Sequence, residues 1–545
     1  MNADRHKQHI RRALPFLIPL AVLLLYLPYI DNPLVFDDLY FFLPGNPERY
    51  VEEGFKLRAR WLSYYSHALT FVWFGDAVRW QRLGNLAINA GCGLLLYGFI
   101  LRLLEDLAST GTDDFKFRLA ALTAALFFVL HPATVFSTGY LIQRTTLLAT
   151  LFSISTWWFF WYGLHSGARW SLCASVPAFA LAALSKEHCV MAPAVSTALL
   201  LLHARNPKKP WKETIGPTTY ISLACQFLIS SLLLAQAARL LGTPYELAAQ
   251  QMLEAAGQSD TQASHMLSAL TQSGLFFKYL LIWALPLSSH MAVDMREPFL
   301  STPLTAVDVA PTLAFSAIPF IGAYLIYRGG KAGLVGIGLT SPWLLFATEL
   351  STIRIQEVFV LYRSYLWIPP LLLIPALGLL QLRARTIGGI AALSSTILFI
   401  GSIDLLESFR QPIFLWDDAV RLVENRREKS GITGIERLYH NRGLALSTAG
   451  MEKNAIDDFS TAISIRPSYA HAYSDRGSSR LKLGSDEEAL RDFDAALKID
   501  SRIVRAHEGR ALALARLGRV EEAAKAHAQA CELGWKKDCE LTDLK

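Results

Sequence analysis

Residues 13–30, ALPFLIPLAVLLLYLPYI, form one apolar run without a charged side chain. A helix that crosses a bilayer needs about 20 predominantly apolar residues, and roughly 17 is the lower limit. Several Lys and Arg residues precede the run, and no small-residue cleavage site follows it. We therefore expect an uncleaved first transmembrane helix whose N-terminal side lies in the cytoplasm.

Runs of the same kind recur along the first 403 residues. The chain of 545 residues is 52% hydrophobic and only 18% charged, whereas soluble domains carry about 25% charged residues. The expected spans are 13–30, 86–104, 117–131, 146–164, 171–184, 189–203, 218–240, 311–327, 332–348, 358–380 and 385–403. The apolar stretch 275–287 is short and has polar flanks, so we expect a re-entrant or interfacial helix there. The sequence thus predicts an all-α, polytopic membrane domain over 1–403 with about eleven spans.

Charge divides the loops of this domain into two groups. Starting from a cytoplasmic N-terminus, alternation places the basic loops 204–217, 328–331 and 382–385 inside, where Lys and Arg are expected to collect. These loops account for the net charge of +6 without a nucleic-acid partner. The loops on the other side hold the polar clusters, which suggests one polar cavity that opens away from the cytoplasm.

The C-terminal part has the composition of a soluble domain and repeats with a period of 34 residues. The recurring positions are Gly450, Gly484 and Gly518, then Ala455, Ala489 and Ala523, and finally Ala462, Ala496 and Ala530. A helix–turn–helix unit of this length is typical of the tetratricopeptide repeat (TPR). We expect a helical linker over 404–435 and then a TPR α-solenoid over 436–545, with three repeats, a C-terminal extension and a concave face that binds a protein or peptide.

The third repeat departs from the pattern. Ala511 occupies a glycine position, and His507 and His527 replace aromatic residues. An atypical terminal repeat suits a polar cap. Cys531 and Cys539 lie near this end, and an oxidising exterior would permit a disulfide between them.

The segment 33–42, PLVFDDLYFF, carries an acidic doublet just after the first span. Asp37 and Asp38 would be costly to desolvate at a membrane boundary without a partner or a role. Neighbouring carboxylates repel each other, which raises the pKa of one of them and favours proton-accepting chemistry. The structural alternative is that one Asp caps the following helix.

Several stretches resemble one family in their order and spacing. They are FDDLYFF at 36–42, RWL at 60–62, RLGNLAINAGCGLLLYGF at 82–99, HPATVFSTGYLIQR at 131–144, SKEHCVMAP at 185–193 and EVFVLYRSYL at 357–366. Together with the TPR tail, they make the chain resemble the bacterial relatives of the transmembrane-and-TPR O-mannosyltransferases, in the GT-C glycosyltransferase superfamily. The chain departs from that family at Phe136, where many relatives carry Glu, and at Leu361-Tyr362, where relatives carry Glu-His.

The resemblance implies an enzyme that transfers a sugar from a polyprenyl-phosphate donor to a protein or glycan acceptor on the non-cytoplasmic side. It also implies a bacterial inner-membrane protein whose active site and TPR domain face the periplasm. Asp37 is then expected to act as the base. Asp38 would orient the acceptor or hold a divalent metal, Mg²⁺ or Mn²⁺, and no other cofactor is implied.

The donor phosphate is anionic and needs cations at the outer boundary, where Arg offers a bidentate fork. The candidate cations are Arg60, Arg144, Lys186, Arg354 and Arg363. Further site candidates are His131, Gln143, Glu187, Glu357 and Asp294. Snorkelling to the interface is the structural alternative for the arginines, and a hydrogen-bonded helix end is the alternative for His131.

Two other functions are compatible with the same features. The first is a non-enzymatic, membrane-anchored TPR scaffold for envelope assembly. The second is a transporter for a lipid-linked sugar, which would need charged groups accessible from both faces during its cycle. The sparse charge inside the expected spans disfavours the transporter.

Overall fold

The computed structural model describes residues 11–42, 45–75, 77–108, 114–206, 215–237, 241–243, 261–426 and 431–534. These residues form helices and loops with no β-strand among them, which confirms the predicted all-α class. The chain divides into two compact units. The first comprises residues 1–291 and 297–410, and the second comprises residues 292–296 and 411–545.

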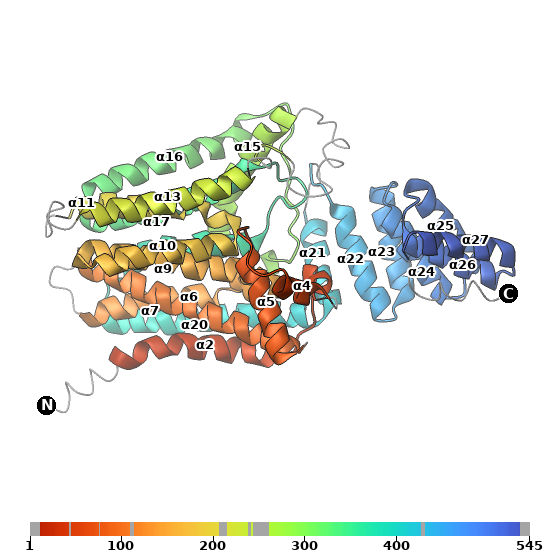
Figure 1. Ribbon diagram of the computed structural model, residues 1–545, viewed down its shortest axis with the longest axis horizontal. Helices are drawn as coiled ribbons and strands as arrows, with labels where there is room; N and C mark the ends of the chain where they lie inside the picture. The colour runs from red at the N-terminus through yellow and green to blue at the C-terminus, as the bar shows by residue number, and fades with distance from the viewer. Residues whose placement is uncertain are drawn as a thin grey trace. The chain divides into compact units, whose positions relative to one another are not determined.

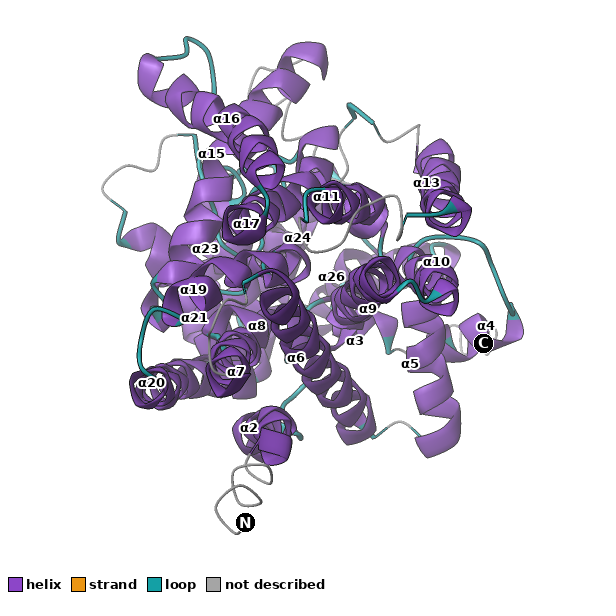
Figure 2. Cartoon of the chain, turned by 90° about the vertical axis from the view of Figure 1, so that its left-hand side faces the viewer, coloured by secondary structure: helices purple, strands orange, loops and turns teal. Residues whose placement is uncertain are grey.

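The first unit is a bundle whose long helices run alongside one another (Figures 1 and 2). Its helices before residue 140 are α2 (Leu17–Tyr26), α3 (Asp37–Phe41), α4 (Asn46–Glu52), α5 (Trp61–Phe74), α6 (Val78–Leu107), α7 (Asp114–Leu130) and α8 (Pro132–Thr138). The later ones are α9 (Arg144–Ser166), α10 (Arg169–Ser185), α11 (Ala192–Ala204), α13 (Pro217–Ala237), α15 (Thr261–Ala284), α16 (Ala306–Arg328), α17 (Gly330–Phe346), α18 (Ser364–Trp367), α19 (Leu373–Leu379) and α20 (Ala384–Arg410). Short 3₁₀ turns at Leu141–Gln143, Glu187–Met191, Ala347–Ser351 and Leu361–Arg363 join several of them.

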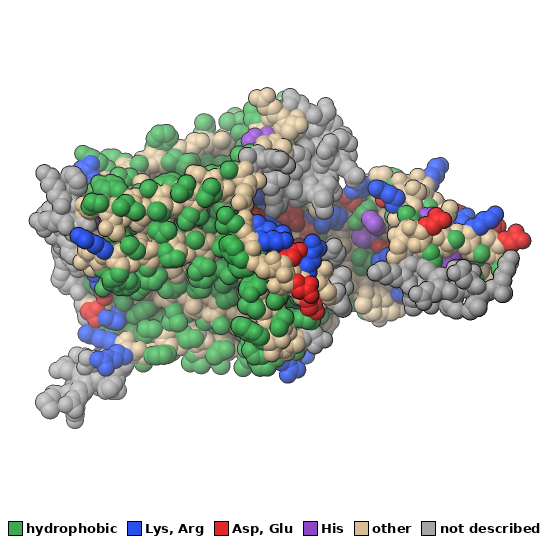
Figure 3. Space-filling view, in the orientation of Figure 1, with side chains coloured by type: hydrophobic (Ala, Val, Ile, Leu, Met, Phe, Trp, Pro, Cys, Tyr) green, Lys and Arg blue, Asp and Glu red, His purple; other side chains and the backbone are tan. Residues whose placement is uncertain are grey.

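Eight helical segments among the described residues are long and apolar enough to cross a membrane. They are Arg11–Tyr29, Val78–Leu107, Leu141–Ser166, Glu187–Ala204, Pro217–Gln236, Ala306–Arg328, Gly330–Ser351 and Ala384–Arg410. A ninth is counted when α7 and α8, which meet at 60°, are taken as one broken span. Hydrophobic side chains cover the side of the bundle in Figure 3, and Lys and Arg side chains gather towards its ends.

The remaining expected spans have a different form. Segments 171–184 and 358–380 correspond to the shorter apolar helices Arg169–Ser185 and Pro369–Leu379, so the count of eleven stays a prediction. The stretch 275–287 is not a separate short helix, because most of it belongs to the 24-residue helix α15. Residues 207–214 of the basic loop lie outside the described residues.

The boundary of the bundle differs from the expected position. Helix α20 continues past residue 403 and ends at Arg410, where the first unit also ends. Residues 292–296 belong to the second unit although they lie between two parts of the first. The sequence does not reveal that this segment belongs to the second unit, because five residues are too few to change the local average hydropathy.

The second unit contains helix α21 (Pro412–Glu424) and three helical hairpins. The hairpins pair α22 (Ile435–Thr448) with α23 (Glu452–Ile465), α24 (Ala470–Lys482) with α25 (Asp486–Ile499), and α26 (Val504–Arg516) with α27 (Val520–Glu532). The three recurring glycines, Gly450, Gly484 and Gly518, follow the first helix of each hairpin and have φ of 79°, 78° and 77°. Glycine adopts this left-handed conformation without steric cost, which explains the 34-residue recurrence.

Two further repeated contacts hold the hairpins together. A Cβ atom added to Gly443 would lie 2.7 Å from the ring of Phe459, so the close helix contact requires glycine there. Arg442 donates to both carboxylate oxygens of Asp458, at 2.8 and 2.9 Å. Arg476 and Asp492 repeat this bidentate pair in the next hairpin, at 3.0 and 2.7 Å. The disulfide considered above involves Cys539, which lies outside the described residues.

Gly443→Val should destabilise the second unit by about 1–3 kcal/mol, because the added side chain overpacks the contact with Phe459. Asn454→Val is the control, since it places the same side chain at an exposed position of α23. Calorimetry of the full chain measures the transition of the TPR unit for both variants. Equal transition temperatures of the TPR unit in the two variants would contradict the proposed contact between residue 443 and Phe459.

Candidate active site

A polar cavity of about 180 Å³ lies at one end of the helical bundle. Its walls come from α3, the N-terminus of α5, the start of α9, the turn after α10 and the segment 354–363. The lining residues are Asp37, Arg60, Tyr64, Ile142, Gln143, Thr145, Lys186, His188, Arg354, Glu357, Tyr362 and Arg363. Two cavities of about 670 and 410 Å³ are larger, but they are lined mostly by apolar side chains. The small cavity therefore holds the groups suited to polar chemistry.

The acidic doublet is divided between two environments. Asp37 is exposed and lines the cavity, and its backbone N–H donates to the Tyr140 hydroxyl at 3.2 Å. Asp38 is fully buried, and its two carboxylate oxygens accept the backbone N–H groups of Leu141 and Ile142 at 3.1 and 2.8 Å. Asp38 thus fastens α3 to the turn before α9, while Asp37 is the carboxylate that faces the cavity.

Burial changes the titration of Asp38 and of the neighbouring Tyr140. Burial raises the pKa of Asp38 to about 7. The two backbone N–H donors favour the ionised form and partly offset this rise. Burial, followed by the nearby Asp37 and Asp38 carboxylates, raises the pKa of the Tyr140 hydroxyl well above its usual value. Tyr140 therefore remains a neutral phenol beside the doublet at physiological pH.

Glu349 does not line the cavity itself but contacts three residues that do. It is 2% exposed, and its Oε1 lies 3.0 Å from Nε2 of His188. Its Oε2 lies 3.0 Å from Nη1 of Arg363 and 3.5 Å from Nε of Arg354. Arg363 also contacts Glu357 Oε2 at 3.0 Å through Nη2. A carboxylate buried this deeply needs such partners, because an unpaired buried charge is strongly unfavourable.

Arg60 and Glu187 form a second ion pair at the cavity. Nε of Arg60 donates to Oε2 of Glu187 at 3.0 Å, and Nη2 of Arg60 contacts Oε1. Glu187 Oε1 also lies 3.5 Å from His188 Nδ1, which joins this pair to the cluster around Glu349. The three arginines that line the cavity, Arg60, Arg354 and Arg363, are therefore held in place by carboxylates before any ligand arrives.

Lys186 has a different set of partners. Its ammonium donates to Thr146 Oγ1 at 2.6 Å and to Gln143 Oε1 at 3.3 Å, and it lies 5.0 Å from the centre of the Tyr362 ring. Burial, and then the positive charge of Arg60, lowers the pKa of Lys186 to about 7. A buried ammonium held by neutral groups is suited to take an anionic ligand.

Two residues at this site have an unusual backbone. Phe36 and Arg60 are the non-glycine residues with positive φ in the described part of the chain, at 53° and 68°. Phe36 immediately precedes Asp37, and Arg60 lines the cavity. Side-chain-bearing residues adopt this conformation at an energetic cost, and such strain concentrates at functional sites.

Three sequence candidates lie elsewhere. Arg144 is buried and donates to Asn85 Oδ1 at 2.8 Å and to the Gln81 carbonyl at 2.7 Å, so it ties helices together and does not line the cavity. His131 is buried, accepts from Ala133 N at 3.1 Å and stacks on Trp283, with ring centres 4.1 Å apart. It therefore caps α8, as its structural alternative proposed.

Asp294 belongs to the second unit, where it contacts Arg296 at 2.5 Å. Seven candidates line the cavity, namely Asp37, Arg60, Gln143, Lys186, Arg354, Glu357 and Arg363. The buried Asp38 does not line it. Glu187 contacts it through Arg60. Sequence reasoning placed the stretch from Glu349 to Arg363 at the expected cavity but assigned no role to Glu349 or Tyr362, and it missed His188 and Tyr64.

The acidic groups do not form an evident metal site. Among the described residues, no three or more His, Cys, Asp and Glu side chains are grouped to hold an ion. Both oxygens of Asp38 already accept backbone hydrogen bonds, which does not fit its expected role as a ligand. We therefore derive no step through Mg²⁺ or Mn²⁺.

Asp38→Ala should destabilise the first unit by about 2 kcal/mol or more, because it leaves two buried backbone N–H groups without acceptors. Asp37→Ala is the matched control, since it removes an exposed carboxylate one residue away. Thermal unfolding in detergent measures the loss of stability in each of the two variants. An equal loss in the two variants would refute the division of roles within the doublet.

A family model described as tetratricopeptide repeat matches residues 436–469. This range coincides with the first predicted repeat and with hairpin α22–α23, so the TPR prediction is confirmed there. No curated protein matches the chain.

Solved structures of MamA are similar to part of the chain. One is 24% identical, with 24% of this chain and 74% of that chain covered and a TM-score of 0.20. Another is 20% identical, with 30% and 90% covered and a TM-score of 0.21. These scores are too low to carry an argument about function, and the tetratricopeptide match covers only a small part of the chain.

Proposed function

We propose that the chain is a membrane glycosyltransferase that moves a sugar from a polyprenyl-phosphate donor to a protein or glycan acceptor on the non-cytoplasmic side. The observation that carries this proposal is the single cavity that contains both Asp37 and Lys186. A carboxylate can accept the proton of a hydroxyl, and an ammonium can stabilise a departing phosphate. The motif resemblance described above supports the same reaction.

The proposed reaction needs only groups that line the cavity. The acceptor oxygen attacks the anomeric carbon of the sugar, and the bond from this carbon to the donor phosphate breaks. Asp37 takes the proton from the acceptor hydroxyl, and the phosphate leaves with the bonding electron pair as polyprenyl phosphate. Because the anomeric carbon is oxocarbenium-like in the transition state, nearby carboxylates also stabilise it.

Lys186 is the group we assign to the leaving phosphate. The arginines of the cavity are already bound to Glu187, Glu349 and Glu357, whereas the hydrogen bonds of Lys186 are to Thr146 and Gln143. Exchanging neutral acceptors for a phosphate is favourable for an ammonium. Arg60 and Arg363 would add positive potential from fixed positions.

A second candidate function is a membrane-anchored scaffold. The tetratricopeptide match favours it, because such arrays bind proteins or peptides on their concave face. In the glycosyltransferase proposal, the same array presents the acceptor. The two functions differ in whether the phenotype depends on Asp37.

Asp37→Asn should lower sugar transfer by at least about 100-fold, because the amide cannot accept the proton. Asp31→Asn is the control, since Asp31 is an exposed acid nearby that contacts Arg79 at 3.6 Å and does not line the cavity. Intact-mass analysis of envelope proteins and glycans from cells carrying each variant measures the transferred sugar. Normal expression and thermal stability of Asp37→Asn exclude misfolding.

Two results would contradict the proposal. Full transfer by Asp37→Asn would exclude this carboxylate as the base. The scaffold would be favoured by two results together: the Asp37→Asn gene fully restores the phenotype of cells that lack the gene, and wild-type cells show no added sugar mass.

Affinity for polyprenyl phosphate should fall several-fold between pH 6 and pH 8, because the charged form of Lys186 binds the anion and its pKa is about 7. Lys186→Arg should remove this fall, since guanidinium stays protonated throughout. The phosphate itself gains charge in this range, so the comparison of the two proteins isolates the lysine. Titration with a short-chain prenyl phosphate measures the affinities. Parallel pH profiles would refute the assignment.

A further inference from the structure

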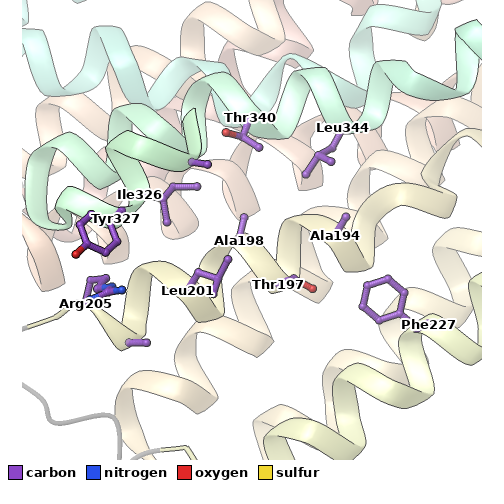
Figure 4. Close-up of a pocket in the computed structure, with 12 residues that line it drawn as sticks. Ala194, Thr197, Ala198, Leu201, Arg205, Phe227, Ile326, Tyr327, Thr340 and Leu344 are labelled. Atoms are coloured by element: carbon purple, nitrogen blue, oxygen red, sulfur yellow. The ribbon is translucent and has the colours of Figure 1, made fainter. Parts of the chain in front are cut away.

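The largest of the cavities described above is an apolar groove in the first unit, with a volume of about 670 Å³ (Figure 4). It runs between α11, α13, α16 and α17 and is separate from the polar cavity. Its lining residues are Ala194, Thr197, Ala198, Leu201, Ala204, Arg205, Phe227, Ala323, Ile326, Tyr327, Thr340 and Leu344. Arg205 is the charged residue of this lining.

The groove follows from how the four helices pack. Glycines bring α16 close to α17, since a Cβ on Gly336 would lie 2.7 Å from the Gly322 carbonyl. Helix α13 is held to α10, where Ser222 donates to the Leu172 carbonyl at 2.8 Å. Helices α13 and α16 therefore lie on either side of α11 (Figure 2). The small alanine side chains of α11 leave the space between α13 and α16 open, and this space is the groove.

The groove opens on a surface suited to lipid. Phe227 is 44% exposed, Leu201 is 56% exposed and Tyr327 is 62% exposed. Helices α13 and α16 are both long and apolar enough to span a membrane, and most of each is not buried by protein. In a bilayer these side chains meet acyl chains, so the groove is accessible to a lipid that enters sideways.

One end of the groove carries positive charge. The guanidinium of Arg205 lies 4.2 Å from the centre of the Tyr327 ring, which holds it at the groove mouth (Figure 4). No carboxylate of the described residues forms an ion pair with Arg205. The end of α16 adds Arg328 and the first turn of α17 adds Lys331. Between them, a Cβ at Gly329 would lie 3.1 Å from the Arg205 carbonyl. The three cations therefore belong to one corner of the bundle.

This corner lies at the opposite end of the bundle from the polar cavity. Lys186 and Arg205 bracket the helical segment Glu187–Ala204. At 1.5 Å per residue, the segment is about 27 Å long, close to the thickness of a bilayer core. In a bilayer crossed by this segment, the Arg205 guanidinium would lie at the headgroup level of the other leaflet. Basic pockets between transmembrane helices at this level attract anionic headgroups.

We propose that this groove binds a membrane phospholipid with an anionic headgroup, one acyl chain lying in the groove and the headgroup against Arg205. Charge complementarity selects this occupant, because a zwitterionic headgroup gains less from three cations that lack carboxylate partners among the described residues. The bound lipid fills the space between α13 and α16 and stabilises the bundle. This site is independent of the proposed glycosyl transfer.

The test uses the full chain in neutral detergent and measures its thermal unfolding midpoint. Added phosphatidylglycerol should raise the midpoint by several degrees, as expected for a ligand that binds only the folded state, and phosphatidylcholine should have little effect. Arg205→Gln should lose most of the rise. Arg383→Gln is the matched control, because Arg383 is an exposed arginine just before α20, at the same end of the bundle.

A second variant tests the groove itself. Thr197→Phe should also lose the rise, because the ring would occupy the channel while Arg205 stays in place. Native mass spectrometry should show one retained phosphatidylglycerol in the wild type and in Arg383→Gln.

Three outcomes would overturn the proposal. If phosphatidylglycerol raised the unfolding midpoint of Arg205→Gln as much as that of the wild type, the headgroup contact would be ruled out. If phosphatidylcholine raised the midpoint equally, the selectivity for an anionic headgroup would be ruled out. If only prenyl phosphate raised the midpoint, and did so equally in the wild type and in Arg205→Gln, the groove would instead hold the prenyl chain of a lipid whose phosphate binds at the opposite end of the bundle.

Discussion

The cavity depends on one buried carboxylate. Glu349 lies at the end of a span, and its environment excludes water, so its charge must be compensated by neighbouring side chains. His188, Arg354 and Arg363 meet there from two separate parts of the chain. Removing any one of them would leave the remaining charges unbalanced in a low-dielectric setting. The electrostatic balance thus fixes the relative positions of the turn after α10 and the segment before α18, which form two walls of the cavity.

The acidic doublet works on the same principle, with a different distribution of roles. Asp38 holds backbone groups of the turn before α9 with its two carboxyl oxygens, and Asp37 faces the cavity. The strained backbone at Phe36 and Arg60 adds to this pre-organisation. Adjacent residues of the same type therefore serve structure and chemistry separately. A cavity in which most charges are fixed in advance needs little reorganisation when a charged ligand enters.

The sequence predicted the TPR unit best, because its signal is local and periodic: each glycine and alanine position follows from contacts within one hairpin or with its neighbour. The site was predicted in part. Acids and bases near span ends lie together because antiparallel neighbours bring those ends to the same level. Arg144 was misplaced because an arginine that binds carbonyls in the bundle has the same sequence pattern as one that binds a ligand. Glu349 was expected in the outer polar cluster but was given no role, because a single sequence does not reveal that His188 from a distant segment contacts it.

The bidentate pairs of the second unit have a consequence for evolution. Arg442 with Asp458, and Arg476 with Asp492, each join the two helices of one hairpin, and each hairpin carries its own turn glycine. Gain or loss of an entire hairpin by gene duplication or deletion would leave these contacts intact in the hairpins that remain. The array could therefore change length between descendants of one ancestor, and acquire new ligands, without redesign of its interior.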